Sequence, residues 1–373
     1  MGSNNSKEHN QSVNIIKNNN CNDTYHSMCE SSNLLATKLS FELGEQYVFS
    51  PLSINYVLSL LHQGSRDLTE EQLTTLLGKK CTINNISECF KVFNNNFVKL
   101  ANAIIVNDDY YINSEYLNKL AHLAHIQSEN FNDPSAVVNN TNKFIEDNTN
   151  HLITNVVKEE MITMKTIMLV INTIYFKANW LQKFDPSNTH KRMFNENITM
   201  EMMSNESSYS YYEDNHIQAI EMHYEDPAYC MGIILPGEKV KMSDCIKPDI
   251  NSLVFSQEQV HITIPKFTQR KKINLINSLT KLGLTELFLP TANLSGITSG
   301  SAYVSEMIHE AVVTVGELGT EATAVTLAIV TRESVRMQIV KPKYFLADHT
   351  FMYYIKHKPS NTLMFIGIYD GTN

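Results

Sequence analysis

Residue types that commonly do chemistry are scattered along this chain rather than gathered into motifs. His122 and His125 stand three residues apart on a predicted helix, a spacing at which two imidazoles could begin a metal site. No third ligand stands near them in the sequence, and neither a CxxC pair nor an HExxH pattern occurs. We therefore interpret both histidines as ordinary helix-surface or core residues and expect no metal site.

Motifs of enzymes are also missing. The sequence contains no G-x-S-x-G elbow, and LGKK at residues 77–80 lacks the upstream glycine that a phosphate-binding loop requires. The six cysteines are spread through 373 residues without the density of a disulfide scaffold, so we expect free thiols. These observations predict no catalytic residues and no cofactor.

Composition narrows the range of partners. A chain of 373 residues that is 43% hydrophobic can bury a large core. Its net charge of −9 argues against nucleic acid, because affinity for phosphates comes mainly from Lys and Arg. We therefore expect a globular protein with no nucleic-acid partner.

One segment near the C-terminus has an unusual alternation of side chains. Residues 316–331 read GELGTEATAVTLAIVT, and side chains of a strand point alternately to its two faces. One face is small and uncharged throughout: Thr320, Ala322, Ala324, Thr326, Ala328 and Val330. Such a strand could enter the middle of a sheet without burying a charge. An ordinary edge strand with one small-residue face fits the alternation as well.

The pattern of the rest predicts one α+β domain, helical at first and mainly strands later. We expect helices near 33–43, 48–64 (after a turn at Ser50-Pro51), 86–99, 114–124, 136–149 and 273–283, with a capping box at Thr69–Gln72 opening another. Strand-like runs cover 167–180, 229–236, 260–267, 335–342, 351–357 and 362–370.

The N-terminal segment, residues 1–32, is rich in Asn and Ser, so we expect it to be weakly ordered. It has no apolar run of the secretory type, which favours a cytoplasmic protein and leaves release by a non-classical route open. Met1-Gly2-Ser3-Asn4-Asn5-Ser6 fits the N-myristoylation pattern. Acylation of Gly2 would give only weak membrane association.

From about residue 33 to its end the chain resembles the serpin family. The matching motifs, in the family's order, are VFSPLSI (48–54), LVINTIYFKANW (169–180), FDP (184–186), IILP (233–236), IPKF (264–267), ANLSGI (292–297), HEAVVTV (309–315), GELGTEATA (316–324), FLADHTF (345–351) and LMFIG (363–367). Each motif is weak alone, but their order and spacing make the resemblance specific.

The resemblance implies a single serpin domain over residues 33–373, with three β-sheets, about nine helices and an exposed reactive-centre loop at about 317–342. Proteins of this family inhibit proteases as suicide substrates: the protease cuts the loop and is held as an acyl-enzyme while the freed loop inserts into the central sheet. The fold is metastable before cleavage. We expect a serine protease as the partner and a monomeric inhibitor.

Five residues match the hinge at which loop insertion begins: Glu317, Gly319, Thr320, Ala322 and Ala324. Members that do not inhibit often carry a charged or bulky residue at the position of Thr320, so this hinge favours an inhibitor. Gly319, which has no Cβ, would let the chain fold over as insertion begins. Gly316 departs from the family, which commonly has Asp, Asn or Glu there.

The cleaved bond is placed differently by two counts along the loop. Counting forward from the hinge gives Glu333–Ser334, or Arg332–Glu333 one residue earlier. Counting back from Phe351 gives Arg336 or Met337.

We favour the forward count, because the distance from the hinge to the acyl bond sets how tightly the captured protease is held. Arg332 and Arg336 suit trypsin-like proteases. Met337 suits chymotrypsin-like or cathepsin G-like ones, and Glu333 suits acid-specific ones.

Three further positions match the family. Ser53, Asn172 and His309 correspond to a hydrogen-bonded cluster, the shutter, beneath the strands that must part. Arg270, Lys271 and Lys272 form the clearest basic run, which we interpret as a solvated turn, and we expect no dependence on heparin. Two alternatives stay open: a non-inhibitory serpin that acts as a carrier, chaperone or storage protein, and an inhibitor of cysteine proteases.

Overall fold

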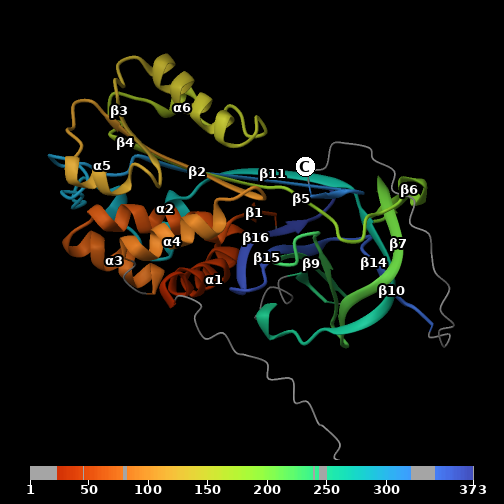
Figure 1. Cartoon of the computed structure of the whole chain (residues 1–373). Coiled ribbons are helices and arrows are strands. Elements are labelled where there is room, and N and C mark those ends of the chain that lie inside the picture. The colour runs from red at the N-terminus through yellow and green to blue at the C-terminus, as the bar shows by residue number, and fades with distance from the viewer. Residues whose placement is uncertain are drawn as a thin grey trace, which may run out of the picture.

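The computed structural model describes residues 23–44, 46–78, 82–237, 240–242, 250–320 and 341–372. Two large sheets and a group of helices make up this part of the chain (Figure 1). The helices are α1 (Asp23–Leu43), α2 (Pro51–Gly64), α3 (Asp67–Leu77), α4 (Ile83–Phe93), α5 (Ser114–Leu120), α6 (Pro134–Asn148) and α8 (Ile276–Lys281).

The seven-stranded sheet carries the features discussed below. Its order is β3-β2-β4-β12-β13-β5, and β11 pairs with the other side of β12. These strands are β2 (Val98–Asn107), β3 (His125–Glu129), β4 (Met168–Phe176), β5 (Ala178–Asn179), β11 (Phe267–Asn274), β12 (Glu306–Gly316) and β13 (Gly319–Thr320).

Alternation of side chains gives this sheet two apolar faces. Ile104 and Val170 belong to the main core with α2, while their neighbours Ile105 and Leu169 pack with α6 in a second core. The sheet is therefore covered on both sides, by α2 and α4 on one and by α6 on the other (Figure 1).

The nine-stranded sheet has the order β1-β16-β15-β9-β8-β7-β10-β14, and β6 also pairs with β7. Its strands are β1 (Val48–Phe49), β6 (Thr189–Phe194), β7 (Ile198–Glu213), β8 (Ile217–His223), β9 (Tyr229–Pro236), β10 (Ser256–Pro265), β14 (Lys343–Leu346), β15 (Phe351–His357) and β16 (Thr362–Tyr369).

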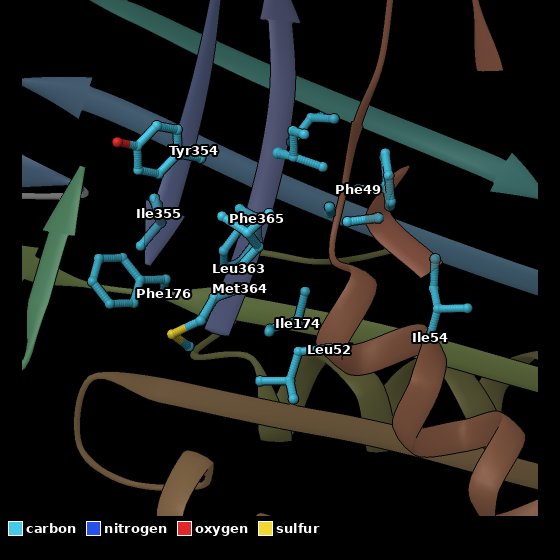
Figure 2. Packing of buried hydrophobic residues seen from close by; sticks show 14 of the residues in the cluster. Phe49, Leu52, Ile54, Ile174, Phe176, Tyr354, Ile355, Leu363, Met364 and Phe365 are labelled. Atoms are coloured by element: carbon cyan, nitrogen blue, oxygen red, sulfur yellow. The ribbon is translucent and has the colours of Figure 1, made fainter. Parts of the chain in front are cut away.

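Helix α2 lies at the centre of the main core. Ser50 caps its first turn by accepting a hydrogen bond from the Ser53 N–H, and Pro51 occupies the first turn, where its missing N–H costs nothing. Leu52 on this helix lies beside Ile174 of β4, and both belong to the same core as Phe365 of β16 (Figure 2). Because 13 of its 14 residues are buried, α2 is apolar around most of its surface.

The α+β architecture agrees with the sequence prediction, although the counts differ. The described residues contain seven α-helices and two sheets, where about nine helices and three sheets were expected. The sheet count differs because β7 is 16 residues long and pairs with β6 near one end and with β8 near the other. One long strand therefore joins two groups of strands into one sheet.

The prediction that residues 1–32 are weakly ordered is wrong for residues 23–32, because α1 begins at Asp23 rather than near Asn33. Met28 and Cys29 face the core, and the Ser32 hydroxyl donates to the Met28 carbonyl at 2.7 Å. The serines of this segment favoured a loop. A serine buried in a helix, however, can donate its hydroxyl hydrogen bond to a backbone carbonyl one turn earlier. Residues 1–22, with Gly2, lie outside the described part.

The capping box predicted at Thr69 is also wrong. Helix α3 starts at Asp67, two residues earlier, and the Thr69 hydroxyl instead accepts a hydrogen bond from the Asn293 N–H at 2.9 Å. A capping box does occur at the next helix, where Thr82 and Asn85 cap α4 reciprocally.

Helix bounds differ elsewhere. Helix α4 ends at Phe93 and strand β2 begins at Val98, so the helix predicted over 86–99 was too long. Helix α5 ends at Leu120, which leaves His122 in a turn and His125 at the start of β3, contrary to the predicted helix over 114–124. The run predicted as a strand over 335–342 lies mostly outside the described residues.

Candidate functional site

The partner of strand β12 in the seven-stranded sheet changes along its length. Strands β4 and β12 pair directly, in parallel, from Leu169 opposite Glu306 to Ile174 opposite Ala311. Further along, β13 lies between β12 and β5, so that Thr320 is opposite both Val315 and Ala178. Gly319 and Thr320, near the start of the alternating segment, therefore already occupy a slot between β12 and β5. Ala322 and Ala324 lie outside the described residues, as do Glu333, Ser334 and the alternates Arg332, Arg336 and Met337.

Gly319 fits this slot for a steric reason. A Cβ at this position would lie 2.1 Å from the Ala178 carbonyl oxygen and 2.6 Å from the Asn179 Cα. Both atoms belong to the backbone of β5 and cannot rotate away. The sequence suggested that Gly319 serves chain reversal, whereas the structure gives it close packing against the neighbouring strand.

Thr320 is held by side chains beneath the slot. It is 1% exposed, and its hydroxyl lies 2.6 Å from the hydroxyl of Tyr224. The Tyr224 ring stacks on the Trp180 indole with 4.5 Å between centroids, and Trp180 Nε1 donates to the Gly316 carbonyl at 2.9 Å. Burial raises the pKa of Tyr224 well above its usual value, so the phenol stays a neutral hydrogen-bonding group.

Glu317 anchors the turn that leads into β13. Its carboxylate lies 3.0 Å from Lys266 Nζ and accepts a hydrogen bond of 3.1 Å from the Thr189 hydroxyl. Burial would raise the pKa of Glu317, but hydrogen bonds and the charge of Lys266 outweigh it and lower the pKa. The ion pair joins β12 to the adjoining nine-stranded sheet through the end of β10.

Ser53, Asn172 and His309, predicted to form one cluster, are brought together below the line where β4 meets β12. The Asn172 amide nitrogen lies 3.0 Å from the Ser53 carbonyl oxygen, and His309 Nδ1 lies 2.7 Å from Asn172 Oδ1. Asn172 and His309 are paired residues of β4 and β12. Their hydrogen bond therefore crosses the boundary between these two strands.

The protonation of His309 follows from its partners. Its Nε2 accepts a hydrogen bond of 3.0 Å from the Ser50 N–H, so Nδ1 carries the proton that is donated to Asn172. Burial lowers the pKa of His309 to about 3, because a charged imidazolium would be desolvated. A second proton would have to bind Nε2, where it would point at the Ser50 N–H and remove the acceptor that this N–H uses.

The basic run at residues 270–272 is part of strand β11, which corrects the predicted solvated turn. Arg270 Nη2 donates to the Thr154 carbonyl and Lys272 Nζ to the Val156 carbonyl, both at 2.8 Å. Arg270 also pairs with Glu310, which is 1% exposed. These contacts, which we call the loop clamp, hold the segment after α6 against β11.

Sequence motifs identified some of these residues but not their contacts. Lys266 stands in the IPKF motif, and Trp180 stands at the end of the LVINTIYFKANW stretch. No sequence motif identified Tyr224, whose hydroxyl contacts that of Thr320. The same is true of Asn102, whose Oδ1 accepts a hydrogen bond from Asn172 Nδ2. Both residues are far in sequence from the residues they contact, so these contacts become apparent only in the folded structure.

No helix in the described ranges is both long and apolar enough to span a membrane. Within the same ranges, no group of three His, Cys, Asp or Glu side chains is placed to hold a metal ion.

Comparison with known proteins gives one family. The family model described as Serpin (serine protease inhibitor) matches residues 30–370. An uncharacterized serpin-like protein of Acanthamoeba polyphaga mimivirus is 38% identical over 340 residues, covering 87% of this chain and 84% of that protein. Human neuroserpin is 28% identical over 354 residues, covering 87% of this chain and 85% of its own length.

Solved structures share the fold. Serpin48 of the insect Tenebrio molitor superposes with a TM-score of 0.82 at 23% identity, covering 94% of this chain and 99% of that one. Native protease nexin-1, solved with heparin, gives a TM-score of 0.79 at 24% identity, covering 93% of this chain and 98% of that one.

Proposed function

Since the chain belongs to the serpin family, whose members are generally protease inhibitors, we propose that it inhibits serine proteases as a suicide substrate. In this mechanism a protease attacks the loop between residues 321 and 340 and forms an acyl-enzyme. The freed segment then continues β13 between β4 and β12, and the attached protease is carried along. We propose Glu333–Ser334 as the cleaved bond, with Arg332, Arg336 and Met337 as alternates.

The observation that carries this proposal is the position of β13. Gly319 and Thr320 sit between β12 and β5, directly above the line where β4 and β12 pair with each other. Continued insertion would extend an existing strand and need not start a new one. The alternation of small residues beyond Thr320 supplies side chains that this position can bury.

The direct test is incubation with a panel of trypsin-like, chymotrypsin-like and acid-specific serine proteases, followed by SDS electrophoresis. We expect a covalent complex that survives boiling with at least one of them. Mass spectrometry of the released C-terminal peptide identifies the cleaved bond. Clean cleavage without a complex across the whole panel, with cysteine proteases included, would reject the proposal.

A substitution at the slot tests the mechanism. Thr320→Arg should abolish the complex while cleavage continues, because a charge would be forced under the sheet beside Tyr224. The matched control is Thr323→Arg, which the alternation assigns to the other face. Equal complex yields from the two variants would contradict insertion along this register.

A further inference from the structure

The segment after α6, residues 149–158, packs over the line where β4 meets β12. Its Ile153 and Val156 belong to the second core together with Ile171 of β4 and Ile308 of β12. Ile171 and Ile308 are paired residues of these two strands. A strand that entered between them would separate the pair, so the segment packed on them would have to move aside.

One buried carboxylate belongs to the loop clamp that holds this segment. Glu310 of β12 is 1% exposed, and its partner on β4 is the uncharged Thr173. Its Oε1 accepts a hydrogen bond from Arg270 Nε, whereas its Oε2 has no hydrogen-bond partner within the described part of the chain. A buried ionised oxygen without a donor is unfavourable, because nothing replaces the water that it has lost.

The charges around Glu310 come from two elements. Arg270 and Lys272 project from β11, and Lys158 and Glu160 after α6 lie within electrostatic range of Lys272. Burial raises the pKa of Glu310, although the charges of Arg270 and Lys272 act in the opposite direction. The loss of hydration therefore outweighs the attraction of the two cations.

Displacement of the segment would expose Glu310 to water, and its pKa would return toward the ordinary glutamate value of about 4.3. The covered state therefore binds a proton more readily than the displaced state. Acid favours the covered state, and a rise in pH favours displacement. The effect begins near the ordinary pKa and is complete above the raised one.

We propose that Glu310 is a pH-sensitive switch for the segment that covers the line between β4 and β12. Its ionised carboxylate makes the covered state less stable at neutral pH, and a proton on that carboxylate holds the segment in place in acid. The loop clamp thus contains both the hydrogen bonds that fasten the segment and the charge that eases its release.

A second step concerns entry of the loop and rests on the proposed function. Because a strand can enter only when the segment moves aside, entry should be slower at pH 5 than at pH 7. Displacement of the segment in the uncut protein does not depend on inhibition.

Amide hydrogen exchange of residues 149–158 in the uncut protein tests the switch, once corrected for the intrinsic pH dependence of exchange. Compared with Glu310→Gln, the natural sequence should lose protection in this segment severalfold between pH 4.5 and pH 7. Glutamine keeps the shape of the side chain but does not titrate. The same pH dependence in both proteins would overturn the proposal.

Three other titratable groups supply matched controls. Glu160→Gln makes the same substitution at a side chain that is 74% exposed. Glu306→Gln does so at a half-buried carboxyl of β12 that accepts a hydrogen bond from Asn274. His151→Gln removes the histidine of the segment, which pairs with Glu146 of α6. Each should keep the natural pH dependence, and its loss in any of them would contradict the assignment.

Arg270→Gln keeps the switch testable if Glu310→Gln does not fold. It removes a charge that lowers the pKa of Glu310, so the pH dependence of exchange should move to higher pH. A purely structural role of Arg270 would weaken protection equally at every pH. An unmoved pH dependence in this variant would count against Glu310 as the titrating group.

Loop entry is measured separately from protease trapping. The single tryptophan, Trp180, donates to the Gly316 carbonyl beside the hinge and reports loop entry by fluorescence after the loop is cut with a non-target protease. From pH 7 to pH 5 entry should slow more in the natural sequence than in Glu310→Gln. Equal rates would overturn this second step but keep the switch, and failure of inhibition alone affects neither result.

Discussion

At the scale of single residues, His309 makes the free energy of unfolding depend on pH. The free imidazole of an unfolded chain has a pKa near 6.5, whereas burial lowers that of His309 to about 3. The unfolded state therefore binds a proton first as the pH falls. The stability contributed by neutral His309 is complete above pH 6.5 and is lost progressively as the pH falls toward 3.

We predict that His309→Gln unfolds with a weaker pH dependence between pH 6.5 and 4. Glutamine keeps a donor and an acceptor for Asn172 and Ser50 without a titrating group. The measurement is the midpoint of urea unfolding across this range. His357, whose pKa burial lowers to about 4, remains in both proteins, so the difference between them belongs to His309. An identical pH dependence would contradict the assignment.

The residues of the site were predictable to the extent that they stand in motifs. The motifs predict that Ser53, Asn172 and His309 form one cluster, and the structure places them within hydrogen-bond reach. Tyr224 and Asn102 were not predicted, because their importance lies in contacts with residues distant in sequence. The loop residues stay predictions.

At the scale of elements, the loop clamp sets how firmly the segment after α6 lies on the sheet. Both cations project from β11, two residues apart and thus on the same side of the strand. Their acceptors are backbone carbonyls of the segment. Displacing that segment breaks two charge-assisted hydrogen bonds.

We expect Lys272→Met to increase amide hydrogen exchange in residues 149–158 severalfold while the rest of the sheet is unchanged, because methionine keeps the apolar stem but not the donor to Val156. Lys271→Met, one residue away on the other face of β11, is the control. Equal exchange in the two variants would show that the clamp does not hold the segment.

Elements with a clear period were predicted better than those without one. Helix α2 and strands β4, β15 and β16 were found close to their observed bounds, because continuous apolar runs mark buried elements. Strand β11 was missed because FTQRKKIN places charged side chains on the sheet surface, where they bind carbonyls and an acidic partner. Charge alone suggested a turn.

At the scale of the whole molecule, the proposed insertion of a strand between β4 and β12 would give a more stable arrangement of the same chain. Inserting about a dozen residues would add about one backbone hydrogen bond per residue, each worth about 1 kcal/mol. The free energy of unfolding would then rise by on the order of 10 kcal/mol.

Cutting the loop with a non-target protease should therefore raise the unfolding temperature by roughly 20 °C, since about 2 °C accompanies each kcal/mol in a large domain. Differential scanning calorimetry before and after cleavage measures the change. Thr320→Arg, cut in the same way, should show little increase. An unchanged temperature for the natural sequence would favour the non-inhibitory alternative.

The two ends of the loop are attached to different sheets. β13 belongs to the seven-stranded sheet and β14 to the nine-stranded sheet. Residues 321–340 connect these two strands along the chain, and hydrolysis of any one peptide bond among them would end that covalent connection. Under the proposed mechanism, a bystander protease that cuts this stretch and escapes would consume one molecule of inhibitor without being trapped. The lifetime of the protein in a proteolytic mixture would then depend on every enzyme present.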